Sequence, residues 1–274
     1  MEPCRKIMPL TETQMQIAKL LSRNRTPDSH LAGGAALHLA PNSSRYSKDL
    51  DYFHDSVERV ARAFADDEVS LREAGYRIEG EIHLPGYIRA QVLHGKEGTK
   101  VEWSHDSAWR FLPALSHPDV GYVLHPMDLA INKVLALAGR DEPRDYLDTL
   151  AVHRDTLSLG ALVWAAVGKD PGFTPDSLLE LLKRRGKYRE EDFQRLRLTF
   201  TPSLPELKET WLDALEGAEK FIRSRPVDEV GCLYFSPKTK DFFAPSPSDE
   251  CTPHYGRPGG VLPRIPSGNC TGSS

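Results

Sequence analysis

Two aspartates, Asp49 and Asp51, lie one residue apart in a stretch that otherwise has the composition of a strand, DLDYFH. Side chains in a strand alternate between its two faces, so both carboxylates are expected on the same face. Carboxylates at that spacing repel each other unless a cation lies between them. Mg²⁺ prefers such oxygen ligands and takes its remaining ones from water and substrate phosphates. The pair therefore predicts a magnesium site, and the alternative is a strand end with two solvated acids.

A phosphate site is predicted next to this pair. Gly33 and Gly34 end an apolar segment and open a short helical one, which leaves backbone N–H groups accessible to a phosphate. Arg45 and Ser47, just ahead of the acids, add a guanidinium group and a hydroxyl. A glycine pair by itself would indicate only a tight turn.

A third acid is expected from a later strand. If Val101 and Trp103 pack inward, Glu102 faces the other side, where it could join Asp49 and Asp51. Asp106 is a second candidate for this position, and the sequence does not separate the two. The alternative for Glu102 is an ordinary surface residue on an edge strand.

Two cations are expected on one face of a later helix. Lys133 lies away from the apolar stripe of the segment that begins at Met127, and Arg140, seven residues on, returns to within about 20° of it. This arrangement suits a triphosphate, and the alternative is a solvated basic face. Further along, Arg144 and Asp148 are four residues apart on an expected helix and could simply pair with each other.

The segments that must position these residues predict an α+β fold. Glycines, prolines and hydrophobic periodicity give the order β, α, β, α, β, β, β after a first helix, and then a mainly helical pattern from Pro126 onward. We expect a small mixed β-sheet with helices on one side, followed by a helical second half. The expected strands are 30–34, 48–54, 76–82, 87–93 and 99–104, with a possible edge strand at 231–235, and the expected helices are 11–23, 35–40, 56–75, 127–138, 143–153, 159–167, 175–185 and 204–224.

Composition limits the classes of protein to consider. The 274 residues carry a formal net charge of −4, which gives no general attraction to nucleic acid or anionic membrane. Four dispersed cysteines without a CxxC pair favour a reducing compartment, so we expect a cytoplasmic protein. No segment has the length and hydrophobicity of a membrane span or the pattern of a signal peptide, so no membrane contact is expected. The expected domains are a sheet domain (1–120), a helical domain that completes the cleft (121–243) and a disordered tail rich in proline and glycine (244–274).

Four motifs together resemble those of a known family. GGAALHL followed by RYSKDLDYF is similar to the nucleotide-binding motif of the DNA polymerase β-like nucleotidyltransferases, in particular the AbiEii/AbiGii-like (abortive infection) toxins. TKVEWSHDSAWRF resembles the strand of the third carboxylate, DLAINKVLAL the lysine helix and RDEPRDYLDTL the closing segment. The resemblance covers roughly residues 30–155, and the motifs occur in the order of the family.

The resemblance implies a Mg²⁺-dependent enzyme that moves a nucleoside monophosphate from an NTP to RNA, in some members transfer RNA, or to a protein. It implies two metal ions held by Asp49, Asp51 and Glu102, with Lys133 at the phosphates. Asp145 would align Lys133 or activate the acceptor hydroxyl. Ala35 departs from the Ser or Thr that the family often has there, so one hydroxyl contact to phosphate is missing.

Family members are toxins of toxin–antitoxin pairs, so a cognate antitoxin is an expected partner. The alternative function is that of a catalytically weak, nucleotide-binding partner protein with the same fold.

Overall fold

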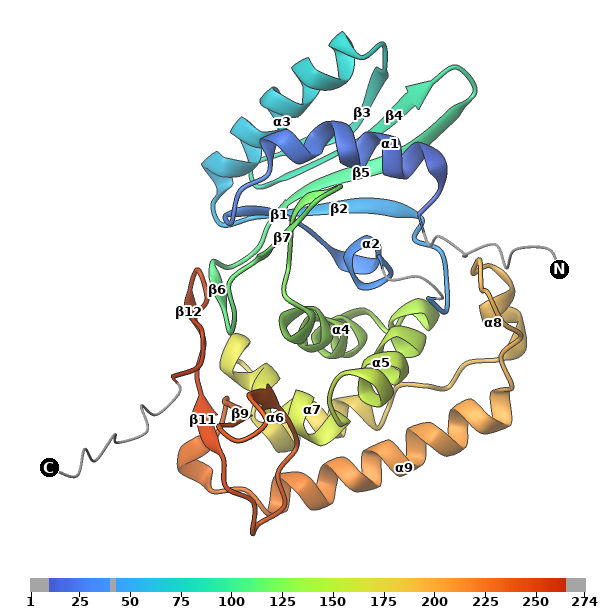
Figure 1. Cartoon of the computed structure of the whole chain (residues 1–274). Helices are drawn as coiled ribbons and strands as arrows, with labels where there is room; N and C mark the ends of the chain where they lie inside the picture. The colour runs from blue at the N-terminus through green and yellow to red at the C-terminus, as the bar shows by residue number, and fades with distance from the viewer. Residues whose placement is uncertain (1–9, 40–42, 265–274) are drawn as a thin grey trace, which may run out of the picture.

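A seven-stranded mixed sheet organises the N-terminal part of the chain in this computed structural model, which describes residues 10–39 and 43–264 (Figure 1). The strand order is β3-β4-β5-β2-β1-β8-β7. β2 runs parallel to β5, and β1 runs parallel to β8, while the other neighbouring strands are antiparallel. The strands are β1 (Ser29–Ala32), β2 (Asp49–His54), β3 (Arg77–Leu84), β4 (Tyr87–His94), β5 (Glu97–His105), β7 (Leu115–His117) and β8 (Gly121–Val123).

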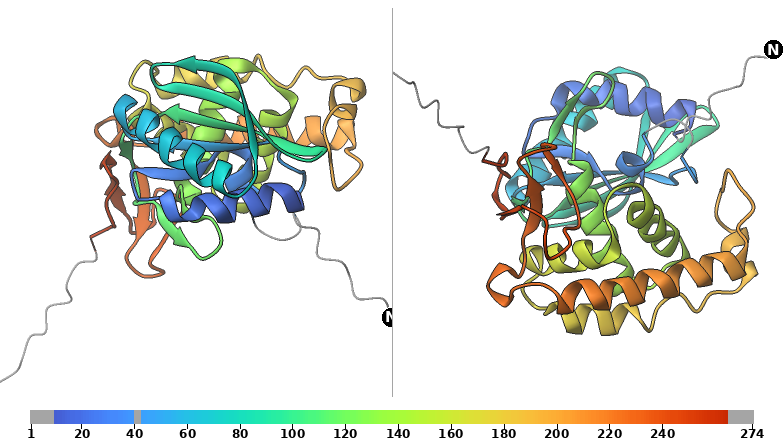
Figure 2. Two further views of the ribbon diagram at one scale, coloured as in Figure 1. Left: turned by 90° about the horizontal axis from the view of Figure 1, so that it is seen from above. Right: turned by 60° about the horizontal axis from the view of Figure 1, so that its bottom comes forward.

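Two helices cover one face of this sheet, α1 (Glu12–Leu21) and α3 (Val57–Glu73) (Figures 1 and 2). Thr11 caps α1 with a capping box, and the Ser56 side chain accepts a hydrogen bond from the first turn of α3. The apolar side of each helix is buried in one hydrophobic cluster with the inward side chains of β2, β4 and β5. Burial of this apolar surface fixes which face of β2 and β5 remains available for polar side chains.

A short helix begins on the opposite face, directly where β1 ends. This helix, α2 (Gly33–Leu37), contacts both β2 and the helix α4 (Pro126–Arg140). It therefore links the sheet to the helical half of the chain. The predicted helix over 35–40 is thus confirmed, although it starts two residues earlier than expected. Ala40 of the expected range lies outside the described residues.

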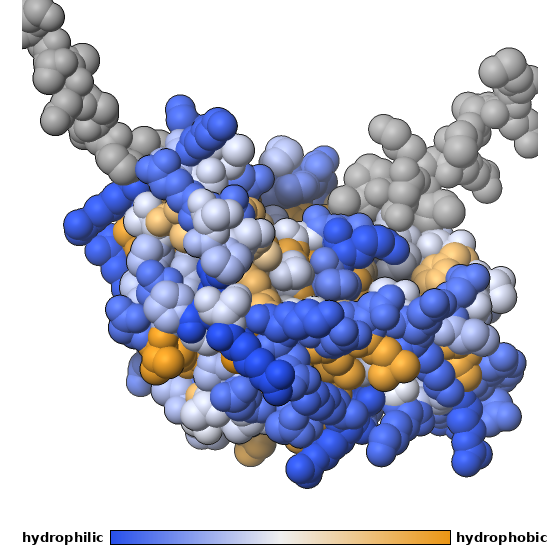
Figure 3. All heavy atoms as spheres, turned by 90° about the horizontal axis from the view of Figure 1, so that it is seen from below, coloured by the Kyte–Doolittle hydropathy of each residue, from blue (hydrophilic) through white to orange (hydrophobic). Residues whose placement is uncertain are grey.

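The second half is helical, as predicted. The helix α6 (Leu159–Lys169) is buried along almost its whole length. It contacts α4, α5 (Pro143–Asp155), α7 (Pro175–Leu182) and α9 (Leu204–Arg223). α9 is amphipathic: it buries Trp211 and Leu215 and turns charged side chains outward, which contributes to the mostly hydrophilic face with apolar patches seen from below in Figure 3. The short helix α8 (Glu190–Gln194) also belongs to this half.

The prediction of a disordered tail is wrong for residues 244–264, which contain two short strands. β11 (Thr252–His254) pairs with β9 (Leu233–Ser236), and β12 (Arg257–Pro258) pairs with β6 (Trp109–Arg110). β10 (Asp241–Phe242) completes the small sheet with β9. Proline and glycine lower the local propensity for a strand, but backbone pairing with distant segments supplies what local propensity lacks. The rest of the predicted tail, 265–274, lies outside the described residues.

The predicted fold class is confirmed: a mixed sheet with α1 and α3 on one side precedes a helical second half. Two hydrophobic clusters, one around the sheet and one among the helices, are consistent with this arrangement. The division into domains at 120 and 243 stays a prediction. Among the described residues, no helix combines the length and apolar composition needed to cross a membrane.

Candidate active site

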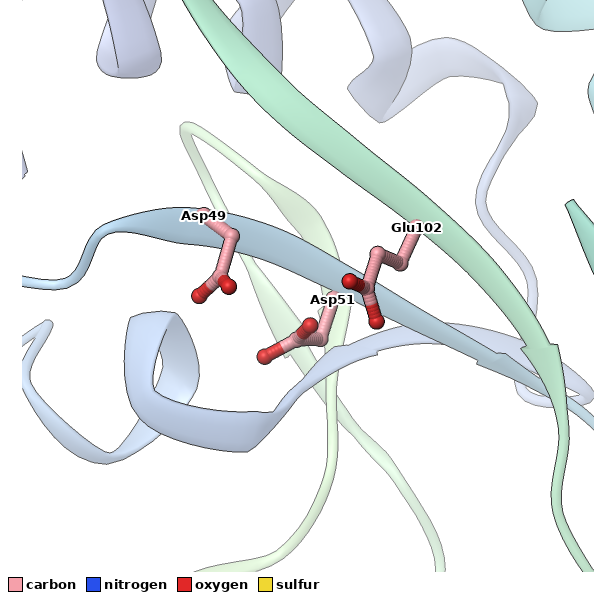
Figure 4. Close-up of side chains that lie close together, drawn as sticks. All are labelled: Asp49, Asp51 and Glu102. Atoms are coloured by element: carbon pink, nitrogen blue, oxygen red, sulfur yellow. The ribbon is translucent and has the colours of Figure 1, made fainter. Parts of the chain in front are cut away.

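Three carboxylates converge on the face of the sheet opposite α1 and α3. Asp49 and Asp51 project from β2 and Glu102 projects from β5, and one oxygen of each lies within 4.8 Å of the others (Figure 4). The parallel pairing places Asp51 directly opposite Glu102 and Asp49 opposite Lys100. Leu50, between the two aspartates, points into the core, as strand alternation requires.

These acids line a cavity of about 400 Å³ between the sheet, the start of α2 and the helices α4 and α5. Gly33 and Gly34 lie in its wall. Gly33 has a φ of +60°, and a Cβ there would collide with the carboxylate of Asp51. The glycine is therefore required both by the backbone conformation and by the close approach of the acid. Among the described residues, six cationic side chains line the cavity: Arg45, Arg89, Lys100, Lys133, Arg140 and Arg144.

Lys100 lies between two of the acids. Its Nζ is 2.8 Å from Oδ2 of Asp49 and 2.8 Å from Oε1 of Glu102. Arg89 Nε donates to the same oxygen of Glu102 at 3.0 Å. Asp51 has no comparable ion pair among the described residues. Each of the other two acids is thus partly neutralised, while Asp51 is the acid that most needs an additional cation.

The pKa values of the aspartates separate accordingly. Burial, together with the charges of Asp49 and Glu102, raises the pKa of Asp51 to about 7. Burial alone would raise the pKa of Asp49, but the hydrogen bond and charge of Lys100 hold it below its ordinary value of 3.8. The same two acids raise the pKa of Lys100 against the opposing effect of burial. A bound divalent cation would offset both the burial and the repulsion that raise the pKa of Asp51.

A pH-dependent loss of stability is expected in metal-free buffer. The pKa of Asp51 is about 7 in the folded protein and about 3.9 in an unfolded chain, so the folded state holds an extra proton between these values. The free energy of unfolding should therefore fall as the pH rises from about 4 to about 7, by up to roughly 4 kcal/mol from this group. Urea unfolding of the wild type and of Asp51→Asn at pH 5 and pH 8 isolates this contribution. Identical pH dependence in the two proteins would contradict it.

Lys133 and Arg140 both lie in the cavity wall, where each is paired with a buried acid, although half of the Arg140 side chain remains exposed. Lys133 is buried, with Nζ 2.8 Å from Asp148 and 3.7 Å from Asp145. Arg140 donates to both oxygens of the buried Asp145, at 2.6 and 2.9 Å. Asp145 thus contacts both cations, a position that suits alignment of Lys133, and it lies outside the residues that line the cavity.

Both residues that were predicted to bind phosphate, Arg45 and Ser47, have partners within the protein, and their role at a phosphate stays a prediction. Arg45 lines the cavity, but its Nε and Nη2 donate to the buried Asp148 at 2.7 and 2.6 Å. The hydroxyl of Ser47 is buried and donates to the backbone oxygen of Asp49. Arg45 therefore stabilises α5 and Ser47 stabilises the start of β2, because a buried donor must find a partner within the protein.

The predicted pair between Arg144 and Asp148 is wrong. Arg144, at the start of α5, turns toward the cavity, with Nη1 3.9 Å from Oδ2 of Asp49. Asp148 lies one turn later on the buried side, where it accepts from Arg45 and faces Lys133. The pKa of Asp148 lies well below its ordinary value: burial would raise it, but Lys133, His38 and Arg45 together outweigh that effect. Tertiary partners have displaced the local i,i+4 pair.

The two candidates for the third acid separate clearly. Glu102 lies with the aspartates, whereas Asp106 accepts from Lys169 at 2.9 Å and is absent from the cavity wall. Ala35 is fully buried in the hydrophobic cluster of the sheet.

Three cations of the cavity were not predicted from the sequence: Arg89, Lys100 and Arg144. A signal was available for Lys100, because it lies two residues before Glu102 and so shares its face of the strand. For Arg89, no such local signal exists, since its position opposite Glu102 depends on the register of β4 with β5.

No family model and no curated protein matches this sequence. Among solved structures, the chain is similar to MenT4, a nucleotidyltransferase toxin of Mycobacterium tuberculosis, with a TM-score of 0.50 and 18% identity over 78% of this chain and 83% of that one. Two structures from Helicobacter pylori, one of them JHP933, align with TM-scores of 0.46 and 0.43 and identities of 16% and 17%. They cover 76% and 78% of this chain and 93% and 97% of theirs. The similarity to MenT4 shows that this chain shares the fold of that protein.

Proposed function

We propose that this protein is a nucleotidyltransferase that transfers a nucleoside monophosphate from an NTP to a hydroxyl group of an RNA or protein acceptor. The observation that carries the proposal is the convergence of Asp49, Asp51 and Glu102 in a cavity that is otherwise lined by cations. Acids alone would bind a metal, and cations alone would bind any anion. The combination fits a metal-bound polyphosphate.

The acidic group fits Mg²⁺. All three donors are carboxylate oxygens, and Asp51 carries a repulsion that a cation would relieve. We infer that Asp49, Asp51 and Glu102 hold up to two ions. Bound Mg²⁺ would neutralise the charge of the phosphates and activate the acceptor hydroxyl. Three or fewer protein ligands per ion are usual for Mg²⁺, since water and phosphate oxygens complete its coordination.

The cations of the cavity would position the nucleotide. Lys133, Arg140 and Arg144 come from α4 and α5, on the side of the cavity opposite the sheet. Their charges would orient a triphosphate against the acids and stabilise the charge of the departing pyrophosphate. The acceptor oxygen then forms the new bond to the α-phosphorus as the bond to pyrophosphate breaks. Asp145 holds Arg140 in place, and Asp148 holds Lys133.

A toxin role of the AbiEii/AbiGii-like kind is part of this proposal. Two independent lines support it: the order of the four sequence motifs, and the fold shared with a nucleotidyltransferase toxin. A cognate antitoxin is the corresponding expected partner. A small antitoxin-like reading frame immediately upstream of the gene would agree with this role.

A nucleotide-binding protein with weak turnover is the second candidate. It is favoured by Lys100, because its ammonium group already lies between Asp49 and Glu102 and would compete with a metal ion for them. The two candidates differ in one measurable respect. The weak binder would take up NTP in the presence of Mg²⁺ without transferring any part of it.

The test is transfer of label from each of the four NTPs, labelled at the α-phosphate, to total cellular RNA or protein in the presence of Mg²⁺. We expect labelled acceptor with at least one NTP, loss of the signal with EDTA, and no signal when the same NTP is labelled at the γ-phosphate. Digestion of the product with ribonuclease or protease identifies the class of acceptor. Transfer of γ-label without α-label would instead indicate a phosphotransferase and refute the proposal.

A further inference from the structure

The cavity face of the sheet is organised in three rows that run across β4, β5 and β2. The strand register places Gln91, Lys100 and Asp49 in the first row and Arg89, Glu102 and Asp51 in the second. The third row consists of Tyr87, Ser104 and Phe53, in which Ser104 pairs with Tyr87 on one side and with Phe53 on the other. All three residues of the third row line the same cavity as the acids.

The cavity is polarised along these rows. Lys100 and Arg144 gather near Asp49, at the end of the first row. The third row, at the other end, consists of uncharged side chains, two aromatic rings with a hydroxyl between them. The guanidinium of Arg89, from the second row, reaches this end and lies 5.5 Å from the ring centre of Tyr87. The carboxylates of Asp51 and Glu102 lie between the cationic end and the aromatic end.

A nucleotide has the same polarity. Its phosphates are anionic, its base is flat with an apolar face, and the ribose joins the two next to the α-phosphate. If the α-phosphate lies at the acids, the phosphate tail reaches the cationic end and the base reaches the third row. Neighbouring rows are two residues apart along each strand, about 7 Å, which leaves room for a ribose. Aromatic rings bind any base by stacking, whatever its hydrogen-bonding groups.

The third row is held in place for such a role. The guanidinium of Arg89 lies 5.5 Å from the ring centre of Tyr87 and also donates to Glu102, so this ring is tied to the acidic group. Phe53 is partly buried against the hydrophobic cluster of the sheet, which anchors one side of it. A purely structural phenylalanine would be covered on all sides, but this one also forms part of the cavity wall.

We propose that Phe53, Ser104 and Tyr87 form the binding site for the base and ribose of a nucleotide held at the acids. This inference rests on the proposed nucleotidyl transfer and adds where the nucleoside binds. The nucleotide is either the NTP, whose α-phosphate lies at the acids, or the terminal nucleotide of an RNA acceptor, whose ribose hydroxyl lies there, and both present a base and a ribose to the third row.

The experiment compares the wild type with Phe53→Leu/Tyr87→Leu, which keeps apolar volume but removes both rings. Calorimetry measures the affinity for each Mg·NTP and for Mg·tripolyphosphate, a probe without a nucleoside. If the row binds the NTP, its affinity falls about tenfold or more while the affinity for tripolyphosphate is unchanged. If the row binds the acceptor, NTP affinity is unchanged and the half-saturating RNA concentration in the transfer assay rises by a similar factor.

Phe200→Leu is the matched control, because Phe200 is a partly exposed phenylalanine in the wall of a different cavity. The inference is overturned if the double variant and this control give the same affinities for NTP, tripolyphosphate and RNA. It is also overturned if the double variant loses NTP and tripolyphosphate affinity equally while remaining folded by circular dichroism. A wild type that binds no Mg·NTP at all would instead refute the proposed function.

Discussion

Asp51→Asn is expected to lower the rate of nucleotide transfer about a thousandfold or more while leaving the protein folded. Asparagine keeps the size of the side chain but removes the charge of the acid that has no ion pair of its own among the described residues. The pKa of Asp51, about 7 without a metal, shows how strongly its surroundings oppose this negative charge. In the folded apo protein, the substitution should therefore cost no stability at neutral pH. The initial rate with an α-labelled NTP and the thermal unfolding of the same preparation provide the two measurements.

Asp106→Asn is the control for this prediction. Asp106 is the first residue after β5, whereas Glu102 lies within the strand. Asp106 pairs with Lys169 and lies outside the cavity wall. Its substitution should change the transfer rate by less than about twofold, whereas Glu102→Gln should resemble Asp51→Asn. If Asp51→Asn kept the full rate, the acidic group would not be the reaction centre. If Asp106→Asn lost as much as Glu102→Gln, the geometry would have assigned the wrong third acid.

The sequence predicts on which face of its strand each acid lies, but it does not predict that the three acids come together. Alternation along a strand is a local rule, so it correctly set Asp49 and Asp51 on one side and Glu102 opposite Val101 and Trp103. The pairing of β2 with β5 is a long-range event, because a helix and a hairpin separate the two strands in the chain. No local pattern states that Asp51 meets Glu102.

Partners of buried charges were predicted least well. Arg45 and Asp148 are 103 residues apart, yet they form a bidentate ion pair in which both groups are buried. The sequence offers Arg144 as a local partner for Asp148 and indicates no protein partner for Arg45. Local spacing favours i,i+4 pairs that are worth only about 0.2–0.5 kcal/mol, so any buried tertiary partner overrides them.

The C-terminal strands were missed for a related reason. Proline and glycine content after residue 244 lowers local propensity, and that composition is typical of disordered chain. In the structure, the ring of His254 lies 3.0 Å from the backbone oxygen of Phe111, and β12 pairs with β6 next to it. These contacts are made with residues more than a hundred positions away, so they leave no periodic signal in the segment itself.

Asp148→Ala is expected to lower the free energy of unfolding by about 3–5 kcal/mol. Asp148 is fully buried and is the common partner of His38, Arg45 and Lys133. Its removal leaves two buried cations with much of their charge uncompensated, and Lys133 keeps only Asp145, at 3.7 Å. Chemical unfolding at pH 7 measures the loss directly. For a chain of this size, the melting temperature should fall by roughly 10 °C.

Asp155→Ala, in the same helix, is the matched control because the pair of Asp155 with Arg154 is exposed to solvent. Exposed pairs are worth about 0–1 kcal/mol, so this variant should unfold close to the wild type. A second variant, Asp148→Asn, separates charge from shape: it should recover part of the hydrogen bonding but not the compensation of Arg45 and Lys133. If Asp148→Ala lost no more stability than Asp155→Ala, Arg45 and Lys133 would have found other partners. The network would then not be what holds Lys133 at the edge of the cavity.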